Sequence, residues 1–540
     1  MHDQAEPTAV SSALWKRAGV PPRPGLAEMA VLERWALTWH GAPRDADLAA
    51  RYCRTALPGG RILLYGAGTH TAWLLDVLRG VPEIQLLGVL DRMAGSMTEF
   101  RGLPVHAVAT AGQLGADYVL VAHTSFEQEM VTALAAAGYP RDRIRTLYSD
   151  PAYAALAEER IAGLAAAVDG GVDHLVVSSA RSEIIPDALL SRLHGCGRAV
   201  QAFVGRADGL PPDGAFDMVD LRESVAALKR LVQRLRPRTI YVRTIIYKNF
   251  LLPLLKHWSP GSVVVGEPYD FTILWSEVDL GLLFGLDAQS IRMLRLGEQL
   301  AGCMLDLIVS KRDGAGWRDL GTAWARPSLQ YFPAVKRPSG PSPAPGSAGD
   351  LVYAGFFPAA SFLKTFRSGY NFVPLLAEVC RQGGLRGDLY NSGHMPGAGD
   401  AVFAEYMAGL PAPVRYHPRQ PYDEMLRLLG GSRYGWLCDH RDRFQGDREV
   451  GVCNRWTGYV SAGLPTLIDR DWTLMATLTH AYSAGLVVHD LTPAAILAQL
   501  RAADWPALQA GTLRLRDHLE RHNETVMGAV AAAFAHQQAG

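Results

Sequence analysis

The sequence has no excess of charge of either sign. Its 540 residues include 53 Lys and Arg against 53 Asp and Glu, so the formal net charge is zero. A chain without an overall basic field does not hold nucleic acid or an anionic membrane surface by charge alone. We therefore expect no nucleic-acid partner, and we expect any anionic ligand to be met by a local group of cations.

Cysteine is scarce and apolar runs are short. The six cysteines include no CxxC pair, which argues against a disulfide framework and against a zinc site. No apolar run approaches the roughly 18 residues that a membrane-spanning helix needs, and the N-terminus MHDQAEPTAV is polar and acidic. These absences predict a cytoplasmic enzyme without a transmembrane segment. The composition, rich in Ala, Arg and Gly, favours a bacterial source.

The length of the chain exceeds what one hydrophobic core can organise, so about three or four domains are expected. Residues 1–57 carry helical patterns at 26–39 and 46–57 without a strand signal between them, which predicts a helical preface. From 58 to 150, short Val- and Leu-rich strands alternate with helices, a pattern typical of a parallel sheet. We interpret this segment as a Rossmann-like domain.

The alternation restarts twice more along the chain. A connecting helix is predicted at 151–172, followed by a second doubly wound unit at 173–337. The segment 338–350, PSGPSPAPGSAGD, is so rich in Pro, Ser and Gly that it predicts an extended, semi-flexible linker. A third unit is predicted at 351–511 and a long terminal helix at 512–540.

The stretch Gly451–Asp469, GVCNRWTGYVSAGLPTLID, reads as a short helix that is stopped by glycine and followed at once by a strand. We predict that Asn454 caps the helix, that Gly463 ends it and that Pro465 opens the strand. The N-terminus of such a helix directs free N–H groups and a positive dipole end at the space before it. A phosphate group is the natural occupant of that space.

This arrangement resembles the NKxxxYLAAGxPVI element of GT-B glycosyltransferases, which borders the sugar-nucleotide donor. The resemblance extends from about residue 173 to the C-terminus and lies chiefly in the order of the elements. Together with the predicted first unit, it implies an α/β fold of three doubly wound, Rossmann-like units, the last two forming a GT-B pair with a cleft between them. It also implies transfer of a sugar from a nucleoside-diphosphate-sugar donor, without a further cofactor, to a glycan, protein or small-molecule acceptor.

Candidate donor-binding residues follow the strands of the third unit. Gly355 comes after a buried strand, where a glycine would let the backbone approach a phosphate, and Asn454 lies at the start of the predicted helix. Lys364 and Arg367 would supply cations to a diphosphate without a metal ion. The alternative for this group is a solvated basic surface beside a turn glycine.

The segment PVRYHPRQPYDEMLRLL resembles the family's base-binding strand, loop and helix. On that resemblance Tyr416 and His417 would border the base, and Asp423 or Glu424 would accept from the ribose hydroxyls. An acidic pair in a first helical turn also complements the helix dipole, which is the alternative for these two acids.

Two departures from the family concern the mechanism. Arg455 stands where lysine is common, and Gly458 stands where many retaining members carry the first glutamate of an EX7E pair. The missing acid favours an inverting, metal-independent reaction in which Arg455 stabilises the leaving diphosphate. The alternative for Arg455 is an arginine on the helix surface.

An inverting transferase needs a general base for the acceptor hydroxyl. Glu267 and Asp270 follow the strand SVVVG and are the favoured candidates, with Glu183 and His257 as others. The aromatic residues beside Asp270 would stack on a sugar ring. For Glu267, an ordinary pairing role in a turn is the alternative.

In the predicted first unit, YGAGTHT supplies Gly66 and Gly68 of a GxG pattern whose third glycine is replaced by Thr71. Asp91 ends the next strand at about the spacing of a ribose-binding acid. This part resembles the Rossmann-like domain that accompanies sugar-modifying enzymes. A bound nucleotide and a docking role both remain open for it.

Two alternatives to the main interpretation stay open. The N-terminal domain could serve an NAD-dependent sugar-nucleotide oxidoreductase or epimerase, or the whole chain could be a catalytically silent protein that binds a glycan or a partner. Asp439, His440 and Asp442 suit a solvated loop better than a metal site, so no metal is expected. A homo-oligomer is compatible with the sequence.

Overall fold

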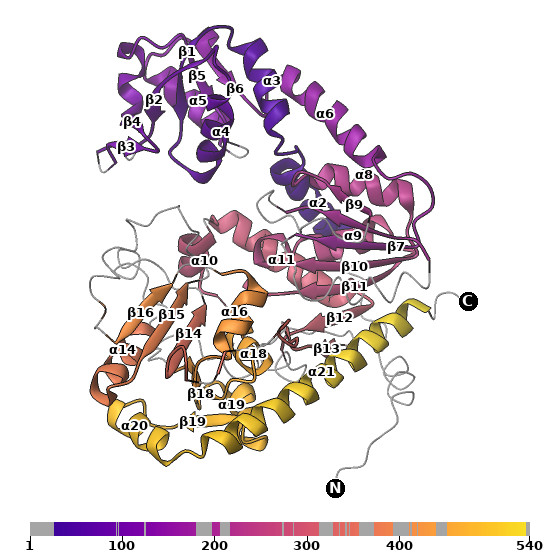
Figure 1. Cartoon of the computed structure of the whole chain (residues 1–540). Helices are drawn as coiled ribbons and strands as arrows, with labels where there is room; N and C mark the ends of the chain where they lie inside the picture. Colours follow the sequence, from indigo (N-terminus) through magenta and orange to yellow (C-terminus); the bar gives the residue numbers. More distant parts are fainter. Residues whose placement is uncertain are drawn as a thin grey trace.

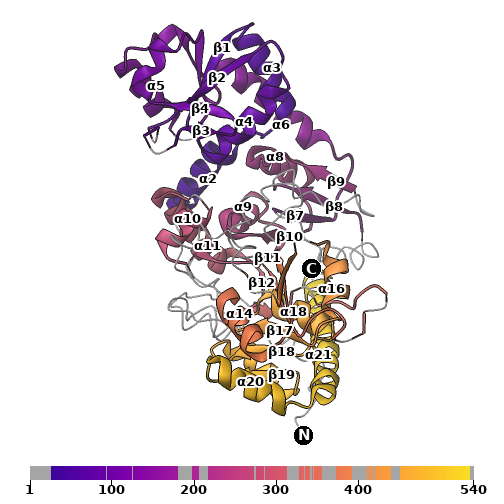
Figure 2. The same ribbon diagram turned by 60° about the vertical axis from the view of Figure 1, so that its left-hand side comes forward.

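The chain folds into three consecutive α/β units, each built on a mainly parallel sheet (Figure 1). Figures 1 and 2 show the units in chain order, from the indigo first unit to the yellow end of the third. The predicted α/β class with three such sheets is therefore confirmed. The computed structural model describes residues 26–92, 94–95, 97–123, 126–179, 197–205, 217–272, 275–284, 286–312, 328–333, 335–340, 343–344, 346–355, 372–391, 410, 413–417, 420–438 and 451–535.

The first sheet has the strand order β3-β4-β2-β1-β5-β6, and only its β3–β4 pair is antiparallel. Its inner strands are buried because their Leu and Val side chains are covered by helices. The elements are α3 (Ala46–Ala56), β1 (Arg61–Tyr65), α4 (Thr69–Arg79), β2 (Gln85–Leu90), β3 (Glu99–Phe100), β4 (Leu103–His106), η1 (Val108–Gln113), β5 (Tyr118–Val121), α5 (Glu127–Ala136), η2 (Arg141–Arg143) and β6 (Ile144–Thr146).

The helix α6 (Pro151–Ala166) connects the first sheet to the second, which has seven parallel strands in the order β13-β12-β11-β10-β7-β8-β9. Sequence reasoning missed β9, because only Val219 of its four residues is buried and the apolar signal is weak. The second unit contains α2 (Leu26–His40), β7 (His174–Ser178), β8 (Ala199–Phe203), β9 (Asp217–Asp220), α8 (Val225–Leu235), β10 (Thr239–Thr244), η5 (Ile246–Lys248), α9 (Leu251–Trp258), β11 (Val263–Pro268), α10 (Glu277–Phe284), α11 (Ala288–Met304), β12 (Leu307–Ser310) and β13 (Ser328–Gln330).

The third sheet has six parallel strands in the order β16-β15-β14-β17-β18-β19. Its strand order reverses between β14 and β17, and doubly wound sheets bind ligands outside the carboxyl ends of the strands at such a reversal. The elements are β14 (Leu351–Gly355), α14 (Phe372–Gly383), β15 (Gly387–Asn391), β16 (Val414–His417), α16 (Tyr422–Leu429), β17 (Tyr434–Leu437), α18 (Asn454–Ser461), β18 (Thr466–Asp469), α19 (Thr473–Ala481), β19 (Gly485–Val488), α20 (Pro493–Ala502) and α21 (Trp505–Ala535).

The two helices of the predicted preface lie where the sequence places them but belong to different cores. In α2, Leu32 and Trp35 pack in the core of the second unit. In α3, Tyr52 and Cys53 pack in the core of the first unit. The preface is therefore not a separate layer, and its two helices help to join the first unit to the second.

The last helix, α21, links the third unit to the second (Figure 1). It begins at Trp505 rather than at the predicted residue 512 and contacts α18, α19 and β19. Its C-terminal half packs Met527 and Phe534 against the second sheet, in one cluster with Tyr241 and Val265. A single helix of 31 residues thus buries apolar surface on both units.

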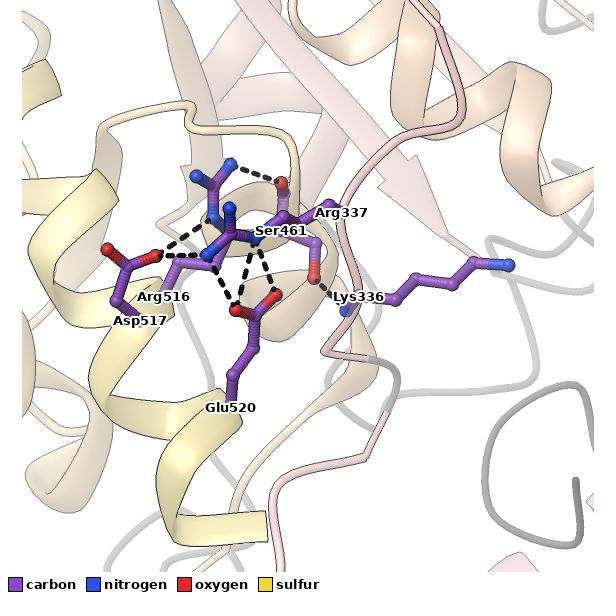
Figure 3. Close-up of polar contacts among 6 residues, drawn as sticks. All are labelled: Lys336, Arg337, Ser461, Arg516, Asp517 and Glu520. Atoms are coloured by element: carbon purple, nitrogen blue, oxygen red, sulfur yellow. Dashed lines mark hydrogen bonds and ion pairs between the residues drawn. The ribbon is translucent and has the colours of Figure 1, made fainter. Parts of the chain in front are cut away.

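The segment that leaves the second unit is held between α18 and α21 (Figure 3). The Lys336 N–H donates to the Ser461 hydroxyl at 3.2 Å, and the Arg337 guanidinium lies 3.1 Å from Asp517 and 3.2 Å from Glu520. Arg337 is well exposed, so these ion pairs add little stability individually. Together with the Lys336 hydrogen bond, they place this segment beside α18 and α21.

Candidate active site

The short helix predicted within Gly451–Asp469 is present as α18. Cys453, with extended backbone, is its N-cap residue, and Asn454 is its first helical residue. The prediction that Asn454 caps the helix is therefore wrong, and Cys453 makes no side-chain capping bond either. The other end agrees with the prediction, because Gly463 has a φ of +69° and its N–H donates to the Val460 carbonyl at 3.0 Å.

Tyr459 fixes α18 against the third sheet. Its hydroxyl accepts from the Ala354 N–H at 3.0 Å and donates to the Trp436 carbonyl at 3.3 Å. The ring lies so close to Gly435 that a Cβ there would be 2.4 Å from the Tyr459 Cγ. Complete burial raises the pKa of the Tyr459 hydroxyl above its ordinary value. This residue thus holds the helix across β14 and β17, where the strand order reverses.

Arg455, in the first turn of α18, lies across the last residue of β14. A Cβ on Gly355 would be 2.5 Å from the Arg455 Cδ and 3.0 Å from its Cγ, so only glycine leaves room for this side chain. The Arg455 Nη1 donates to the Tyr353 hydroxyl at 2.5 Å, and the guanidinium carbon lies 5.3 Å from the centroid of that ring. Two predicted site residues, Gly355 and Arg455, are therefore in direct contact at the switch point.

Gly458, the position of the missing acid, faces another helix. The atoms nearest to a Cβ there are the Leu426 Cδ2 and the Tyr422 hydroxyl of α16, both at 4.0 Å. The Cβ of a side chain at this position would point toward α16, whereas the Arg455 side chain of the same helix lies over the end of β14.

The predicted base-binding residues stand at the carboxyl end of β16. His417 stacks on Tyr390 with ring centroids 4.5 Å apart, and its Nε2 lies 2.7 Å from the Asp388 carboxylate. The Tyr416 hydroxyl accepts from the Asn391 side-chain amide at 3.3 Å. An aromatic pair and an amide thus border this edge of the sheet.

Asp388 is a residue that sequence reasoning missed. Its side chain is almost fully buried and also receives Arg415, whose Nε and Nη2 lie 3.0 Å from its two oxygens. Burial raises the pKa of the Asp388 carboxyl, but the hydrogen bonds from His417 and Arg415 outweigh it and hold this pKa below its usual range. In the strand sequence Gly-Asp-Leu-Tyr-Asn, nothing distinguishes a buried aspartate from one on an exposed edge strand.

The two acids at the start of α16 have other partners. Glu424 forms an ion pair with Arg427, one turn along the same helix. Asp423 pairs with Lys336 of the segment that leaves the second unit. The position of both acids in the first turn agrees with helix-dipole complementation, and the pair of Asp423 with Lys336 also anchors the chain. The ribose role of Glu424 stays a prediction.

On the acceptor side, the structure separates the two favoured base candidates. Glu267 is 3% exposed and lies within β11, where it accepts from the Tyr241 hydroxyl at 2.6 Å and lies 3.4 Å from Arg243. Burial raises the pKa of the Glu267 carboxyl against the opposing effects of Arg243 and Tyr241. Glu267 therefore completes a buried polar cluster on the face of the sheet that α21 covers.

Asp270 lies on the loop after β11, and its side chain is 27% exposed. Its Oδ1 lies 2.8 Å from the Lys311 Nζ and 3.3 Å from the Arg312 Nη2. Lys311 also lies 4.0 Å from the centroid of the Tyr269 ring. The geometry thus favours Asp270 over Glu267 as a group that an acceptor can reach.

Arg312 joins the two halves of the site. Its side chain is buried and contacts Asp270, while its backbone forms an isolated antiparallel bridge with Gly451, just before α18. The Asp270 loop and the start of α18 therefore lie next to each other although they belong to different units. Sequence reasoning missed this residue, because a cation after a strand gives no indication of a contact across domains.

In the first unit, Gly66 and Gly68 form the predicted loop before α4. Gly66 has a φ of +100°, which favours glycine, and Gly68 is the N-cap residue of the helix. The Asp91 carboxylate accepts from the Ala67 N–H of the same loop at 2.7 Å. In this structure Asp91 thus supports the glycine loop itself, and its ribose role stays a prediction.

Several predicted residues lie outside the described ranges: Lys364, Arg367, Glu183, Asp439, His440 and Asp442. Within the described ranges, His, Cys, Asp and Glu side chains form no group of three or more that is suited to a metal ion. None of the described helices combines the length and the apolar character that a membrane span requires.

No family model and no curated protein matches the sequence. Solved structures do resemble the fold. The UGT2 of Phytolacca americana, solved with UDP-2-fluoro-glucose and pterostilbene, is 9% identical, with a TM-score of 0.41 over 67% of this chain and 100% of its own. AviGT4, a glycosyltransferase involved in avilamycin A biosynthesis, is 10% identical, with a TM-score of 0.40 over 68% of this chain and 98% of its own.

A UDP-GlcNAc 2-epimerase from Methanocaldococcus jannaschii is also similar, at 10% identity and a TM-score of 0.36 over 61% of this chain and 91% of its own. These likenesses concern the arrangement of elements alone, and nothing about activity follows from them. Within the chain itself, α21 returns from the third unit to pack against the second sheet.

Proposed function

We propose that the chain is a glycosyltransferase that moves a sugar from a nucleoside-diphosphate-sugar donor to an acceptor hydroxyl. The observation that carries this proposal is the contact between Arg455 and Gly355 at the strand-order reversal of the third sheet. A guanidinium fixed at the start of a helix, over a strand end without a side chain, is suited to a diphosphate.

The proposed reaction is inverting and needs no metal ion. The acceptor oxygen attacks the anomeric carbon of the donor, and Asp270 takes the proton of the acceptor hydroxyl. The bond from the anomeric carbon to the diphosphate oxygen breaks, and the electron pair leaves with the nucleoside diphosphate. Arg455 and the N–H groups of the first turn of α18 stabilise the negative charge that develops on this leaving group.

The position of Asp270 fits this role in one further respect. Arg312 contacts Asp270 with its side chain and Gly451 with its backbone, so Asp270 lies near the start of α18. The proposed base and the proposed leaving-group site therefore face each other where the second unit meets the third. Glu267 is assigned a supporting role, because its carboxylate is buried with Arg243 and Tyr241.

The test is the release of nucleoside diphosphate from a panel of UDP-, GDP- and dTDP-sugars. We expect at least one donor to be turned over, with kcat reduced about 10²- to 10³-fold in Arg455→Ala and less in Arg455→Lys, which keeps a cation. If no donor is turned over and none binds, the catalytically silent alternative is favoured. If NAD(H) alone raises the thermal midpoint, the oxidoreductase alternative is favoured.

A further inference from the structure

A cavity of about 300 Å³ lies where the first and second units meet. Its walls come from the C-terminal end of α2, the turn before α3, the helix α6 and the start of α8, and these helices can be followed in Figures 1 and 2. None of the residues assigned to the candidate active site lines it. Most of the wall is aromatic or aliphatic, from Leu37, Trp39, Tyr148, Tyr153, Ile161 and Ala226.

Three charged side chains also line this cavity, Arg44, Glu158 and Glu223, and the Arg44 Nη1 lies 3.6 Å from the Glu223 Oε1. Glu223 has a φ of +62° and Arg222 a φ of +51°, a conformation that L residues rarely adopt. The turn is held there because Arg44 N–H donates to the Arg222 carbonyl at 2.8 Å and the Ser224 hydroxyl donates to the Gly41 carbonyl at 2.6 Å. Strain that the surroundings enforce in this way is found at functional sites.

Two buried polar groups at this place have no hydrogen-bond partner within the described part of the chain. One is the hydroxyl of Tyr153, which lines the cavity. The other is the ammonium of Lys248, which lies 5.8 Å from the centroid of the Phe250 ring, and the cavity-lining His40 stacks on the same ring at 5.1 Å. Lys248 is therefore adjacent to the cavity, behind the His40 wall.

The charges around the cavity do not balance. Burial lowers the pKa of Lys248 to about 8, so the ammonium is largely protonated at neutral pH, whereas burial lowers the pKa of His40 well below its ordinary value and leaves it neutral. Arg44 and Lys248 are thus two cations against the single carboxylate of Glu223. Glu158, at the wall, is paired with Arg230. A buried cation without a hydrogen-bonded counter-ion is unfavourable, and an anion in the neighbouring cavity would offset part of its charge without touching it.

We propose that this cavity binds a small organic anion, a carboxylate or a phosphate monoester carried on one compact ring. The anionic group would lie toward Arg44 and the Lys248 side, and the ring would pack against Trp39 and Tyr153. The volume is at the lower end of the range for small-molecule sites and suits one ring rather than a dinucleotide. Because the walls belong to two units, the bound ligand would also stabilise the position of the first unit on the second.

The experiment uses the full chain and three probes: benzoate, glucose 1-phosphate and inorganic phosphate. Binding is measured by calorimetry, and the thermal midpoint is recorded with and without each probe. The variants are Lys248→Met and Arg44→Gln, and the control is Arg34→Gln, which removes an exposed arginine of α2 that does not line the cavity.

We expect either benzoate or glucose 1-phosphate to bind more tightly than inorganic phosphate. Binding of benzoate would identify the ligand class as a carboxylate, and binding of glucose 1-phosphate would identify it as a phosphate monoester. Lys248→Met and Arg44→Gln should each weaken that binding at least about tenfold, while Arg34→Gln leaves it unchanged. Without ligand, Lys248→Met should raise the thermal midpoint, since it removes a buried cation. The proposal is overturned if neither ring-bearing probe binds at millimolar concentration, or if Arg44→Gln binds it as the wild type does.

Discussion

The substitution Gly355→Ala tests the packing of Arg455 with a single methyl group. The new Cβ would lie 2.5 Å from the Arg455 Cδ, 3.0 Å from its Cγ and 3.3 Å from its Nε. Carbon atoms in contact are separated by about 3.5 Å or more, so the middle of the arginine side chain has to move by roughly 1 Å. A displacement of that size in a group that stabilises a transition state lowers the rate by about 10²-fold.

The same change should leave the stability nearly unaltered. The variant loses one hydrogen bond, between Arg455 and Tyr353, which is worth about 1 kcal/mol. Alanine regains roughly 0.5–1 kcal/mol over glycine inside a strand, since the unfolded chain is less flexible. We therefore expect kcat/KM for the donor to fall while the thermal midpoint stays almost constant.

The control for this prediction is Gly458→Ala, one turn along α18. A Cβ there has no neighbour closer than 4.0 Å, so the variant should gain roughly 0.5–1 kcal/mol of helix stability and keep the wild-type rate. Donor turnover and thermal unfolding are measured on both variants. An unchanged kcat/KM in Gly355→Ala, or an equal loss in Gly458→Ala, would refute the assignment of Arg455.

Three further predictions follow from the site. Asp270→Asn should lower kcat about 10²- to 10⁴-fold with little change in the thermal midpoint. Glu267→Gln should instead cost about 3 kcal/mol of stability, because it removes the buried carboxylate that faces Arg243; the reverse pattern would exchange their roles. Tyr353→Phe should lower kcat/KM about tenfold, since Arg455 loses a hydrogen bond that orients it, and an unchanged value would show that the tyrosine only packs. Asp388→Asn should destabilise the protein most at neutral pH. The folded-state pKa of Asp388 is lowered, so its stabilising effect is present above the unfolded value of about 3.9 and is lost as the pH falls through the folded value; the difference in thermal midpoint between variant and wild type should shrink on acidification.

Much of the architecture could be predicted from the sequence, because buried parallel strands are continuous Val and Leu runs and doubly wound units repeat them between helices. α18 and its stop at Gly463 follow from local turn chemistry. The distribution of α2 and α3 between two cores could not be predicted, since an amphipathic helix does not specify which sheet it covers.

The candidate site was predicted in part. Gly355 and Arg455 could each be proposed from their place after a strand and at a helix start, but their contact depends on the packing of α18 over β14. The preference for Asp270 as the proposed base could not come from the sequence. Glu267 lies within β11, whereas Asp270, three residues later, lies on the loop after it. The prediction that Asn454 is the N-cap residue was wrong. An N-cap at Asn454 would require the helix to begin at Arg455, whereas the helix begins at Asn454 itself.

The proposed function depends on the binding of the donor diphosphate at Arg455 in the third unit. The most direct test is a crystal structure of the full chain with UDP or GDP. We predict that the diphosphate lies within hydrogen-bond distance of the Arg455 guanidinium and of backbone N–H groups in the first turn of α18, with Gly355 beside it. A nucleotide found instead at Gly66 and Gly68 of the first unit, with no density near Arg455, would contradict it.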